Sequence, residues 1–415
     1  MKGALSNQQT LRLKYAVELR RARVEGPDSD RPYVGLENIE SRTGRLIPSA
    51  TTGAAEGEFV STSGESLSAL FEEGDILFGK LRPYLAKAWI AEFNGRCSTE
   101  LLPLRPEKIH PRFGLYIVLS QQFIDAVDAS TFGSKMPRAD WEFIGNLPIP
   151  LPPQQKQSDV VRFLDRETAD IDDLIAAKQQ LLDLLAEKRR AIVADAVMRG
   201  LNPAASLRPS GIDWLGDIPA HWEVERSRWL FRERDERSET GTEEMLTVSH
   251  ITGVTPRSEK DVNMFEAEST AGYKLCFAGD LAINTLWAWM GAMGIARVDG
   301  IVSPAYNVYT PGPRLLPDYV DALVRIPVFA QEVTRYSKGV WSSRLRLYPE
   351  GLFETRWPVP PLDEQQQIVE HIAAETAKID RLRAATEHSI TLLKERRGAL
   401  IAAAVTGQID IPEAA

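Results

Sequence analysis

A stretch free of glycine and proline, from Gln154 to Val197, constrains the fold of this chain more than any other feature. Apolar side chains recur through it in a seven-residue register, which is the pattern of a helix that packs lengthwise against another helix. One position of this register is occupied by Leu164, Ile171, Leu185 and Ile192. The stretch therefore predicts a single helix well beyond the length of an ordinary core helix.

The C-terminal part of the chain repeats this stretch without a gap, so that Pro152 aligns with Pro360 and Val197 aligns with Val405. In the repeat, the same register position is occupied by Ile372, Ile379, Leu393 and Leu400. Each helix buries its apolar face most simply against the other. We therefore expect an antiparallel pair with these register residues at its seam, and a pseudo-two-fold axis between the two halves of the chain.

A strand-rich segment precedes each predicted helix. Residues 1–150 contain short apolar runs bounded by Gly-Asp and Asn-Gly turns, and residues 223–357 repeat that outline more weakly. The predicted fold class is α+β, with two mixed, strand-rich domains that alternate with two long helices paired as an antiparallel coiled coil. The predicted boundaries are 1–150 for the first domain, 151–204 for the first helix and the start of a connector, 205–357 for the second domain, and 358–415 for the second helix and tail.

The segment at 199–222 carries three prolines and three glycines, so we interpret it as a boundary connector rather than a core element. Gly74-Asp75 and Gly279-Asp280 stand at equivalent places in the two domains. Their carboxylates could suggest acid–base chemistry, but turns that lead into strands explain them better.

The overall charge argues against a uniformly basic nucleic-acid binder, since the formal net charge is −9 and the pI is about 5.3. Binding to DNA would require local clusters of basic residues, or positive surface on partner subunits. No apolar run reaches the roughly 20 residues of a membrane span, and the N-terminus has no signal-peptide core. Cys97 and Cys276 are far apart, so reduced thiols in a cytoplasmic protein are expected.

The motifs of several enzyme classes are missing from the sequence. It contains no Asn-Pro-Pro-Tyr or Asp-Pro-Pro-Tyr tetrad, no G-x-G-x-x-G after a strand and no G-x-x-x-x-G-K-[ST] loop. The five histidines lack metal-ligand spacing, so no metal site is expected. We predict no catalytic residues in this chain.

The layout resembles the DNA-specificity subunit of type I restriction–modification systems over nearly the whole chain. The most specific stretch is SGIDWLGDIPAHWEV (210–224), which is similar to the segment that opens a target-recognition domain in that family. Further similar stretches are GDILFGKLRPYLAK (74–87), AVMRGLNP (196–203), AVTGQIDIP (404–412), Glu167-Thr168 and Glu375-Thr376. Two departures are the missing entry segment at the N-terminus and the replacement of GKLRPYLAK by NTLWAWMGA in the second domain.

The resemblance implies a noncatalytic, cytoplasmic subunit in which each domain reads one half of a split target in double-stranded DNA. The paired helices would set the half-site spacing and dock two modification subunits, which carry S-adenosylmethionine and methylate adenine. Restriction (translocase) subunits would complete the complex. No cofactor is expected in this chain itself, and no membrane partner. The alternative is a coiled-coil scaffold that joins two protein-binding domains without a DNA role, which the acidic pI favours slightly.

Given this resemblance, basic, polar and aromatic residues on loops are the candidates for DNA contact, because Arg can pair with guanine and Lys can neutralise phosphate. In the first domain the candidates are Lys80, Arg82, Tyr84, Lys135 and Arg138. In the second domain the candidates are Trp287, Ser342, Ser343, Arg344 and Arg346. The alternative reading is solvated charges beside turns and, for Trp287 and Trp289, core packing.

Four arginines near the helix ends, Arg189, Arg190, Arg396 and Arg397, leave two readings open. They are either ordinary solvated charges at helix C-termini or an ion-pair cluster that faces the other helix or a partner.

Overall fold

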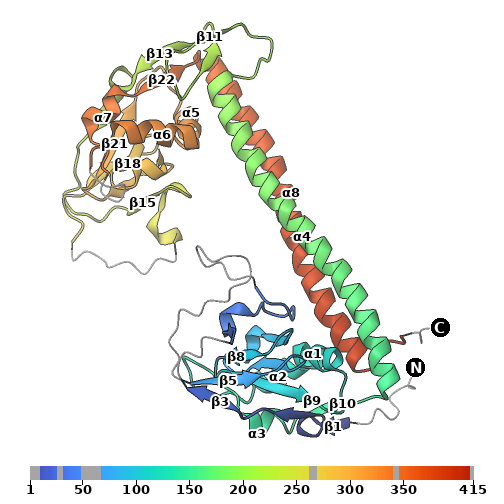
Figure 1. Cartoon of the computed structure of the whole chain (residues 1–415). Helices are drawn as coiled ribbons and strands as arrows, with labels where there is room; N and C mark the ends of the chain where they lie inside the picture. The colour runs from blue at the N-terminus through green and yellow to red at the C-terminus, as the bar shows by residue number, and fades with distance from the viewer. Residues whose placement is uncertain (1–9, 26–30, 48–66, 261–268, 340–344, 412–415) are drawn as a thin grey trace. The chain divides into compact units, whose positions relative to one another are not determined.

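The computed structural model describes residues 10–25, 31–47, 67–260, 269–339 and 345–411 (Figure 1). The chain divides into two compact units, one made of Met1–Gln179 with Glu387–Ala415 and the other of Gln180–Thr386. The boundary between the units crosses both long helices. Each unit therefore contains one strand-rich globule and a portion of each helix.

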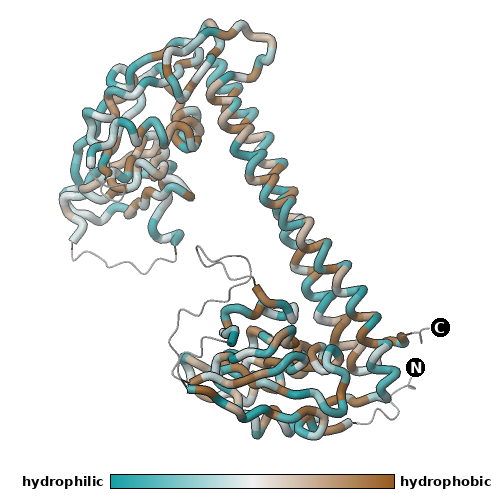
Figure 2. Tube along the Cα trace, viewed as in Figure 1, coloured by the Kyte–Doolittle hydropathy of each residue, from teal (hydrophilic) through white to brown (hydrophobic). Residues whose placement is uncertain are grey.

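The two long helices predicted from the heptad register are present, as α4 (Gln154–Arg199, 46 residues) and α8 (Leu362–Val405, 44 residues). Within the first unit the Lys156 ammonium, near the start of α4, donates to the carbonyl of Ile411, just past the end of α8 (2.9 Å). Within the second unit Arg189 of α4 pairs with Asp380 of α8. These contacts make the pair antiparallel in each unit, and apolar residues alternate with hydrophilic ones along both helices (Figure 2).

The register residues differ in what covers them. Leu164, Ile171, Leu185 and Ile379 are almost fully buried, whereas Ile192, Ile372, Leu393 and Leu400 are partly buried. Leu164 and Leu400 join the core of the first globule, and Ile372 packs against the core of the second. The ends of the helix pair thus share their apolar face with the globules.

In the first unit, four antiparallel strands form a sheet in the order β2-β9-β6-β7. Their bounds are Val17–Leu19, Leu101–Pro106, Ile76–Gly79 and Ala88–Ile90. A second sheet has the order β3-β5-β8-β4, with bounds Arg23–Glu25, Leu67–Phe71, Gly95–Cys97 and Tyr33–Val34. The strands β1 (Thr10–Arg12) and β10 (Pro148–Pro150) pair with each other. The helices are α1 (Pro111–Leu119), α2 (Gln121–Asp128) and α3 (Trp141–Ile144), with the short 3-10 helices η1 (Leu13–Tyr15), η2 (Leu36–Asn38) and η3 (Pro83–Leu85).

The second unit repeats the first of these sheets, as a four-stranded antiparallel sheet in the order β14-β21-β18-β19. Their bounds are Phe231–Arg234, Tyr306–Pro311, Leu281–Asn284 and Met293–Ile295. The remaining strand pairs are β11 (Leu207–Pro209) with β12 (Asp217–Pro219), β13 (Glu223–Arg226) with β22 (Arg356–Val359), β15 (Leu246–Ser249) with β16 (Gly253–Pro256), and β17 (Lys274–Cys276) with β20 (Gly300–Val302). The helices are α5 (Pro317–Val324), α6 (Pro327–Tyr336) and α7 (Pro349–Glu354), with 3-10 helices η4 (Ser227–Trp229), η5 (Arg257–Glu259) and η6 (Ala288–Met290).

The Gly-Asp turns have a structural role in both units. The buried Asp75 carboxylate accepts a hydrogen bond from the Glu72 backbone N–H (2.8 Å) and pairs with Arg20 (2.5 Å). In the second unit Asp280 accepts from the Phe277 N–H (2.9 Å) and pairs with Arg234 (2.8 Å). These buried carboxylates are thus occupied by structural partners, as their position before a strand indicates.

Each long helix begins with the same glutamine arrangement. The Gln157 amide donates to the carbonyl of Pro152 (2.8 Å) and accepts from the backbone N–H of His110 (2.8 Å). Gln365 makes the equivalent bonds to Pro360 and Leu316, each at 2.8 Å. The proline-to-glutamine segment therefore fixes the start of each helix against the first helix of its globule, α1 or α5, and explains why it occurs twice.

The segment at 199–222 corrects one expectation. Ile212, Leu215, Ile218 and Trp222 are buried in the core of the second globule. The indole N–H of Trp222 donates to Glu364 near the start of α8 (2.9 Å). The glycines and prolines shape turns here, but the apolar residues between them pack as core, so the segment is part of the second unit rather than a free linker.

Both cysteines are buried and neither forms a disulfide. Burial, followed by the charge of Asp280, raises the pKa of the Cys276 thiol to about 12, so it stays protonated at neutral pH. Among the described residues, no helix combines the length and apolar character needed to cross a membrane. The same part of the chain contains no cluster of three metal-ligating side chains.

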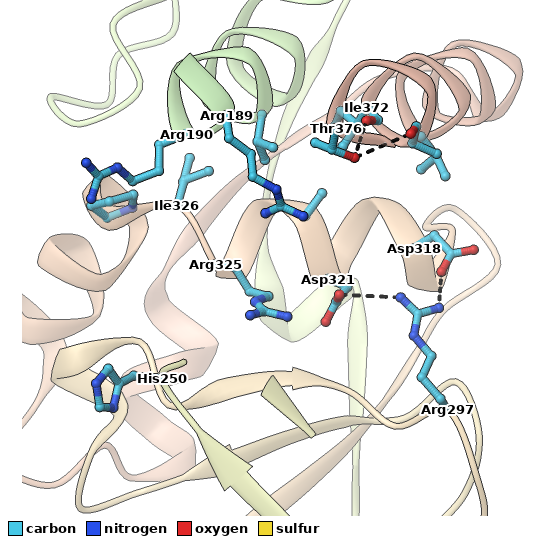
Figure 3. Close-up of a pocket in the computed structure, with 15 residues that line it drawn as sticks. Arg189, Arg190, His250, Arg297, Asp318, Asp321, Arg325, Ile326, Ile372 and Thr376 are labelled. Atoms are coloured by element: carbon cyan, nitrogen blue, oxygen red, sulfur yellow. Dashed lines mark hydrogen bonds and ion pairs between the residues drawn. The ribbon is translucent and has the colours of Figure 1, made fainter. Parts of the chain in front are cut away.

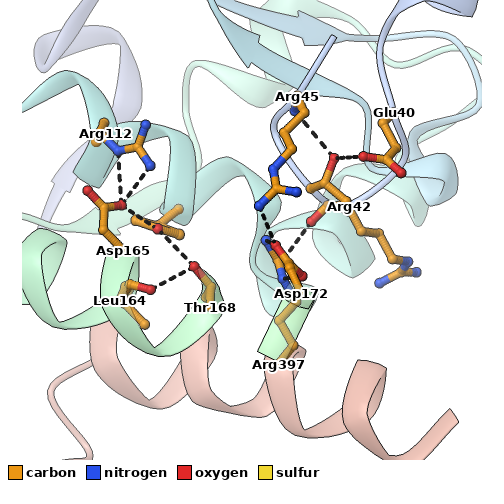
Figure 4. Close-up of polar contacts among 11 residues, drawn as sticks. Glu40, Arg42, Arg45, Arg112, Leu164, Asp165, Thr168, Asp172 and Arg397 are labelled. Carbon is orange, nitrogen blue, oxygen red and sulfur yellow. Dashed lines mark hydrogen bonds and ion pairs between the residues drawn. The ribbon is translucent and has the colours of Figure 1, made fainter. Parts of the chain in front are cut away.

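Arg397 and Arg189 occupy equivalent positions in the two helices, and both make an ion pair with the other helix. In the first unit Arg397 bonds Asp172 (2.9 Å) and the carbonyl of Arg42 (2.8 Å), and Arg45 also reaches Asp172 (3.0 Å) (Figure 4). The Arg397 side chain is 10% exposed. Arg189, at 3.5 Å from Asp380, is 51% exposed. The ion-pair reading thus holds for these two arginines, while Arg190 and Arg396 are exposed.

We predict that Arg397→Ala lowers the free energy of unfolding by about 2–3 kcal/mol, because it leaves the Asp172 carboxylate short of a buried partner. Arg189→Ala, the matched control, should change it by less than about 1 kcal/mol because its ion pair is solvated. Urea unfolding of the full-length chain measures both values. Equal effects of the two variants would contradict the difference in burial.

Candidate nucleic-acid interface

Two loops of the first unit that the sequence singles out lie side by side. The loop at 80–84 follows β6, and the loop at 133–138 precedes α3. The backbone N–H of Arg82 donates to the carbonyl of Pro137 (2.8 Å), and that of Ala139 donates to the carbonyl of Lys80 (3.0 Å). An antiparallel bridge joins Leu81 to Arg138. The fold therefore combines residues more than fifty positions apart into one surface.

Hydrogen bonds fix the backbone of the 80–84 loop, while the side chains of Arg82 and Tyr84 are exposed. Arg82 has a left-handed backbone (φ 48°), which is uncommon for a residue with a Cβ and marks a constrained turn. Its carbonyl accepts from Leu85 (2.9 Å), which closes η3. The side chains of Arg82 and Lys135 are exposed, as is 45% of Tyr84. Exposed cations and an aromatic ring on a fixed backbone are suited to contacting nucleic acid.

Arg138 is less available for contact with DNA than the other candidate residues. Its Nε and Nη2 atoms lie 3.0 and 2.9 Å from Oε1 of Glu100. The hydrogen bond to Glu100 raises the pKa of the Arg138 guanidinium. Arg138 therefore helps to hold the 133–138 loop against the sheet, and only its remaining donors can face a ligand.

A groove of about 510 Å³ continues from the 80–84 loop through Lys80. It is lined on its basic side by Arg20, Arg21, Arg23 and Lys80. Arg21 and Arg23 are exposed and were not among the predicted contact residues. The sequence did carry a signal for them, since three arginines stand within Arg20–Arg23. That local cluster is the kind of feature that an acidic overall charge hides.

The second unit brings its corresponding loops together with the same backbone contact. The N–H of Leu347 donates to the carbonyl of Thr285 (3.1 Å), as Ala139 does to Lys80 in the first unit. A bridge joins Lys338 to Arg346, and Arg346 is exposed. The other predicted loop residues, Ser342, Ser343 and Arg344, lie outside the described residues.

Trp287 is not a core residue. Half of it is exposed, and it stacks on Trp289 with ring centroids 6.3 Å apart. The Trp289 indole donates to the carbonyl of Leu286 (3.1 Å), which fixes the pair in the 284–290 loop. Core packing, the reading that the sequence left open, therefore does not apply to Trp287, and its ring face is available for stacking.

The second unit also contains a pocket of about 530 Å³ beside α4 and α8 (Figure 3). Its basic lining includes Arg189, Arg190, Arg325 and His250. Arg325 donates to the carbonyl of Ile251 (2.7 Å). The remaining lining contains Arg297, which pairs with Asp318 and Asp321, and is otherwise largely apolar.

Comparison with known proteins gives a consistent result. Residues 52–184 match the family model described as the type I restriction modification DNA specificity domain. The chain is 29% identical over 155 residues to the type I restriction enzyme EcoDI specificity subunit of Escherichia coli, covering 37% of this chain and 31% of that protein. It is 27% identical over 111 residues to the MjaVIII specificity subunit of Methanocaldococcus jannaschii, covering 26% and 24%. The aligned regions thus span about a third or less of these relatives.

The solved structures extend the likeness of fold to almost the whole chain. A chain from a study of complex assembly and conformational transition of the type I R-M system aligns with a TM-score of 0.70 at 18% identity, covering 97% of this chain and 98% of that one. The HsdS subunit from Thermoanaerobacter tengcongensis aligns with a TM-score of 0.52 at 18% identity, covering 97% of each chain. The α+β architecture with two long helices is therefore shared with these structures.

Proposed function

We propose that this chain is the noncatalytic specificity subunit of a type I restriction–modification system, the subunit that selects the DNA target, because residues 52–184 match the DNA specificity domain of that family. The observation that carries this proposal is the pair of loops in each unit, held by the same backbone contact and carrying exposed basic or aromatic side chains. Each unit would read one half of a split target in double-stranded DNA.

The residues of the two units suggest different modes of contact. In the first unit Arg82 can form a bidentate pair with guanine, while Lys80 and Lys135 can neutralise phosphates. In the second unit Trp287 presents an aromatic face, and Arg346 supplies a cation. The two halves of the target would then differ in sequence, because the two sets of side chains differ.

Exposed leucines on the long helices support docking of two modification subunits. Leu174 of α4 and Leu382 of α8 occupy equivalent places in the repeat, as do Leu184 and Leu392, and all four are exposed. Exposed apolar side chains at paired positions favour an interface with another protein. Because the repeat supplies each place twice, it fits two copies of one partner, which would bring S-adenosylmethionine and methylate adenine. Restriction subunits would join that complex.

The alternative is a scaffold without a DNA role, which the net charge of −9 favours. The cluster of Arg21, Arg23 and Lys80 argues for DNA, because it concentrates positive charge beside the predicted contact loop. A scaffold would show no sequence preference and no dependence of DNA binding on salt.

We expect Arg82→Ala, assayed in the complex with modification subunits, to weaken binding of the cognate duplex by about 1–3 kcal/mol, the range of one bidentate base contact. Arg82→Asn gives a second variant that tolerates the left-handed backbone. Binding titrations with cognate and scrambled duplexes measure the change, and Arg12→Ala, exposed on β1, is the control. Unchanged cognate affinity would remove Arg82 from the interface.

Two double variants test this docking. Leu184→Glu with Leu382→Glu changes the second unit, and Leu174→Glu with Leu392→Glu changes the first. We expect each double variant to lose one modification subunit, because it places charge in an apolar contact. Native mass spectrometry of the co-expressed complex gives the stoichiometry, which should fall from two copies to one. Gln180→Glu, an exposed change on the same helix, is the control. Two copies in both double variants would contradict docking at these leucines.

The helices connect the two units, so their length should set the half-site spacing. Seven residues inserted at the unit boundary in both α4 and α8 add about 10 Å of helix. This corresponds to about three base pairs, since one strand rises roughly 3.4 Å per nucleotide. Sequencing of methyladenine in cells that express the complex should reveal a two-part motif with a longer spacer. If the native chain gave no methylated two-part motif, the proposed function would be refuted. If the insertion left the spacer unchanged, the role of the helices in setting the spacing would be refuted.

A further inference from the structure

The internal repeat allows the same sheet edge to be compared residue by residue in the two units. The N–H of Leu70 in β5 donates to the carbonyl of Ala22 (2.9 Å). The N–H of Leu275 in β17 donates to the carbonyl of Glu236 (2.8 Å). Ala22 and Glu236 are therefore equivalent, which places Arg20–Arg23 at the position of Arg234–Arg237. The ion pairs of Arg20 with Asp75 and of Arg234 with Asp280 agree with this alignment.

In the first unit this edge carries uncompensated positive charge. Arg20 is neutralised by Asp75 and by Glu72 (2.6 Å). Among the described residues, no ion pair forms at Arg21, Arg23 or Lys80, and no carboxylate lines their groove. Its walls are otherwise Leu19, Ala69, Thr99, Leu101, Leu102 and Pro103. A concave surface with cations and low-dielectric walls concentrates positive potential.

In the second unit acidic residues neutralise the positive charges of the same edge. Asp235 stands where the first unit has Arg21, and it pairs with Arg237 (3.1 Å) and Lys274 (3.4 Å). Glu236 stands in place of Ala22 and pairs with Arg234 (2.8 Å). Thr285 takes the place of Lys80, as their shared backbone contact indicates. The groove along β14, about 440 Å³, is lined by two arginines and three acidic residues, whereas the equivalent groove along β2 is lined by four cations and two acidic residues.

The difference has no evident role in folding. Both units keep the buried arginine–aspartate pair and the same strand order in the sheet that contains β2 or β14, so this scaffold does not require Arg21, Arg23 or Lys80 to be cationic. Solvated like charges that are close together and without partners are instead suited to a polyanion. A DNA backbone supplies phosphates at regular short spacing, and Lys80 connects the groove to the loop that would read bases.

We propose that the first unit is the electrostatic anchor on DNA, with Arg21, Arg23 and Lys80 on backbone phosphates, and that the second unit contributes little to phosphate binding. This inference rests on the proposed function. Its consequence is that the two half-sites are held differently. Affinity at the first half-site depends strongly on salt, whereas recognition by the second unit relies on less salt-sensitive contacts such as those of Trp287.

The test uses the complex with modification subunits and a cognate duplex, with affinity measured across a series of salt concentrations. Replacing Arg21, Arg23 and Lys80 by alanine should reduce the slope of log K against log salt by about 2.7, at roughly 0.9 for each phosphate that the variant no longer neutralises. The double variant Arg21→Ala with Arg23→Ala, which leaves the half-buried Lys80 intact, should reduce it by about 1.8. The matched control is Arg232→Ala with Arg237→Ala on the second unit, and its slope should stay near the native value.

A reciprocal exchange sharpens the test. Arg21→Asp with Ala22→Glu gives the first unit the charges of the second at these two positions, and should lower both the slope and the affinity. Asp235→Arg with Glu236→Ala gives the second unit the charges of the first at these two positions, and should raise the slope by about 1–2. Duplexes in which one half-site is scrambled assign each change to a half of the target.

The outcomes separate this inference from the proposed function. Sequence-specific binding by the native complex, with a native slope in the triple and double alanine variants, would overturn the anchor and leave the function standing. Absence of sequence-specific, salt-dependent binding by the native complex would overturn both. Loss of a modification subunit from the triple variant, with DNA binding per complex unchanged, would assign the groove to a protein partner and overturn the anchor.

Discussion

The structure depends on the burial of one apolar face of each long helix against the other. Helices of 46 and 44 residues expose too much apolar surface to stand alone, and here the antiparallel partner covers the seam at Ile171, Leu185 and Ile379. At the ends of the helix pair the globules cover the apolar face, since Leu164 and Leu400 pack in the core of the first globule and Ile372 packs against the core of the second. A change in this seam would thus affect the globules as well as the helices.

The two units share a buried framework but differ in their exposed surfaces. The repeated elements are buried: the arginine–aspartate pair beneath the sheet edge and the glutamine that fixes the start of each long helix. The divergent elements are exposed, such as Arg21 against Asp235. This distribution is what two recognition modules on a shared framework require, because burial constrains the scaffold while the surface is free to change.

Individual residues show how far the sequence could predict the candidate site. Lys80, Arg82 and Lys135 stood out as basic residues on turns, and the structure places both turns on one surface. Arg138 looked equivalent to them, but its ion pair with Glu100 depends on a contact between separate segments that no local pattern reveals. Arg21 and Arg23 were readable as a cluster but not as part of a groove with Lys80, which lies on another strand.

The sequence by itself determined the two long helices and their alternation with two related strand-rich segments, because these follow from periodicity and from an internal repeat that can be read along the chain, whereas the expected antiparallel pairing is established by contacts between the helices. Tertiary structure alone decided which loops meet, which charges are neutralised and that Ile212, Leu215, Ile218 and Trp222 are core. Those properties depend on side chains distant in sequence, whose approach is set by sheet order and packing rather than by local pattern. The acidic composition describes the whole chain, whereas the positive groove exists only where the fold brings Arg21, Arg23 and Lys80 together.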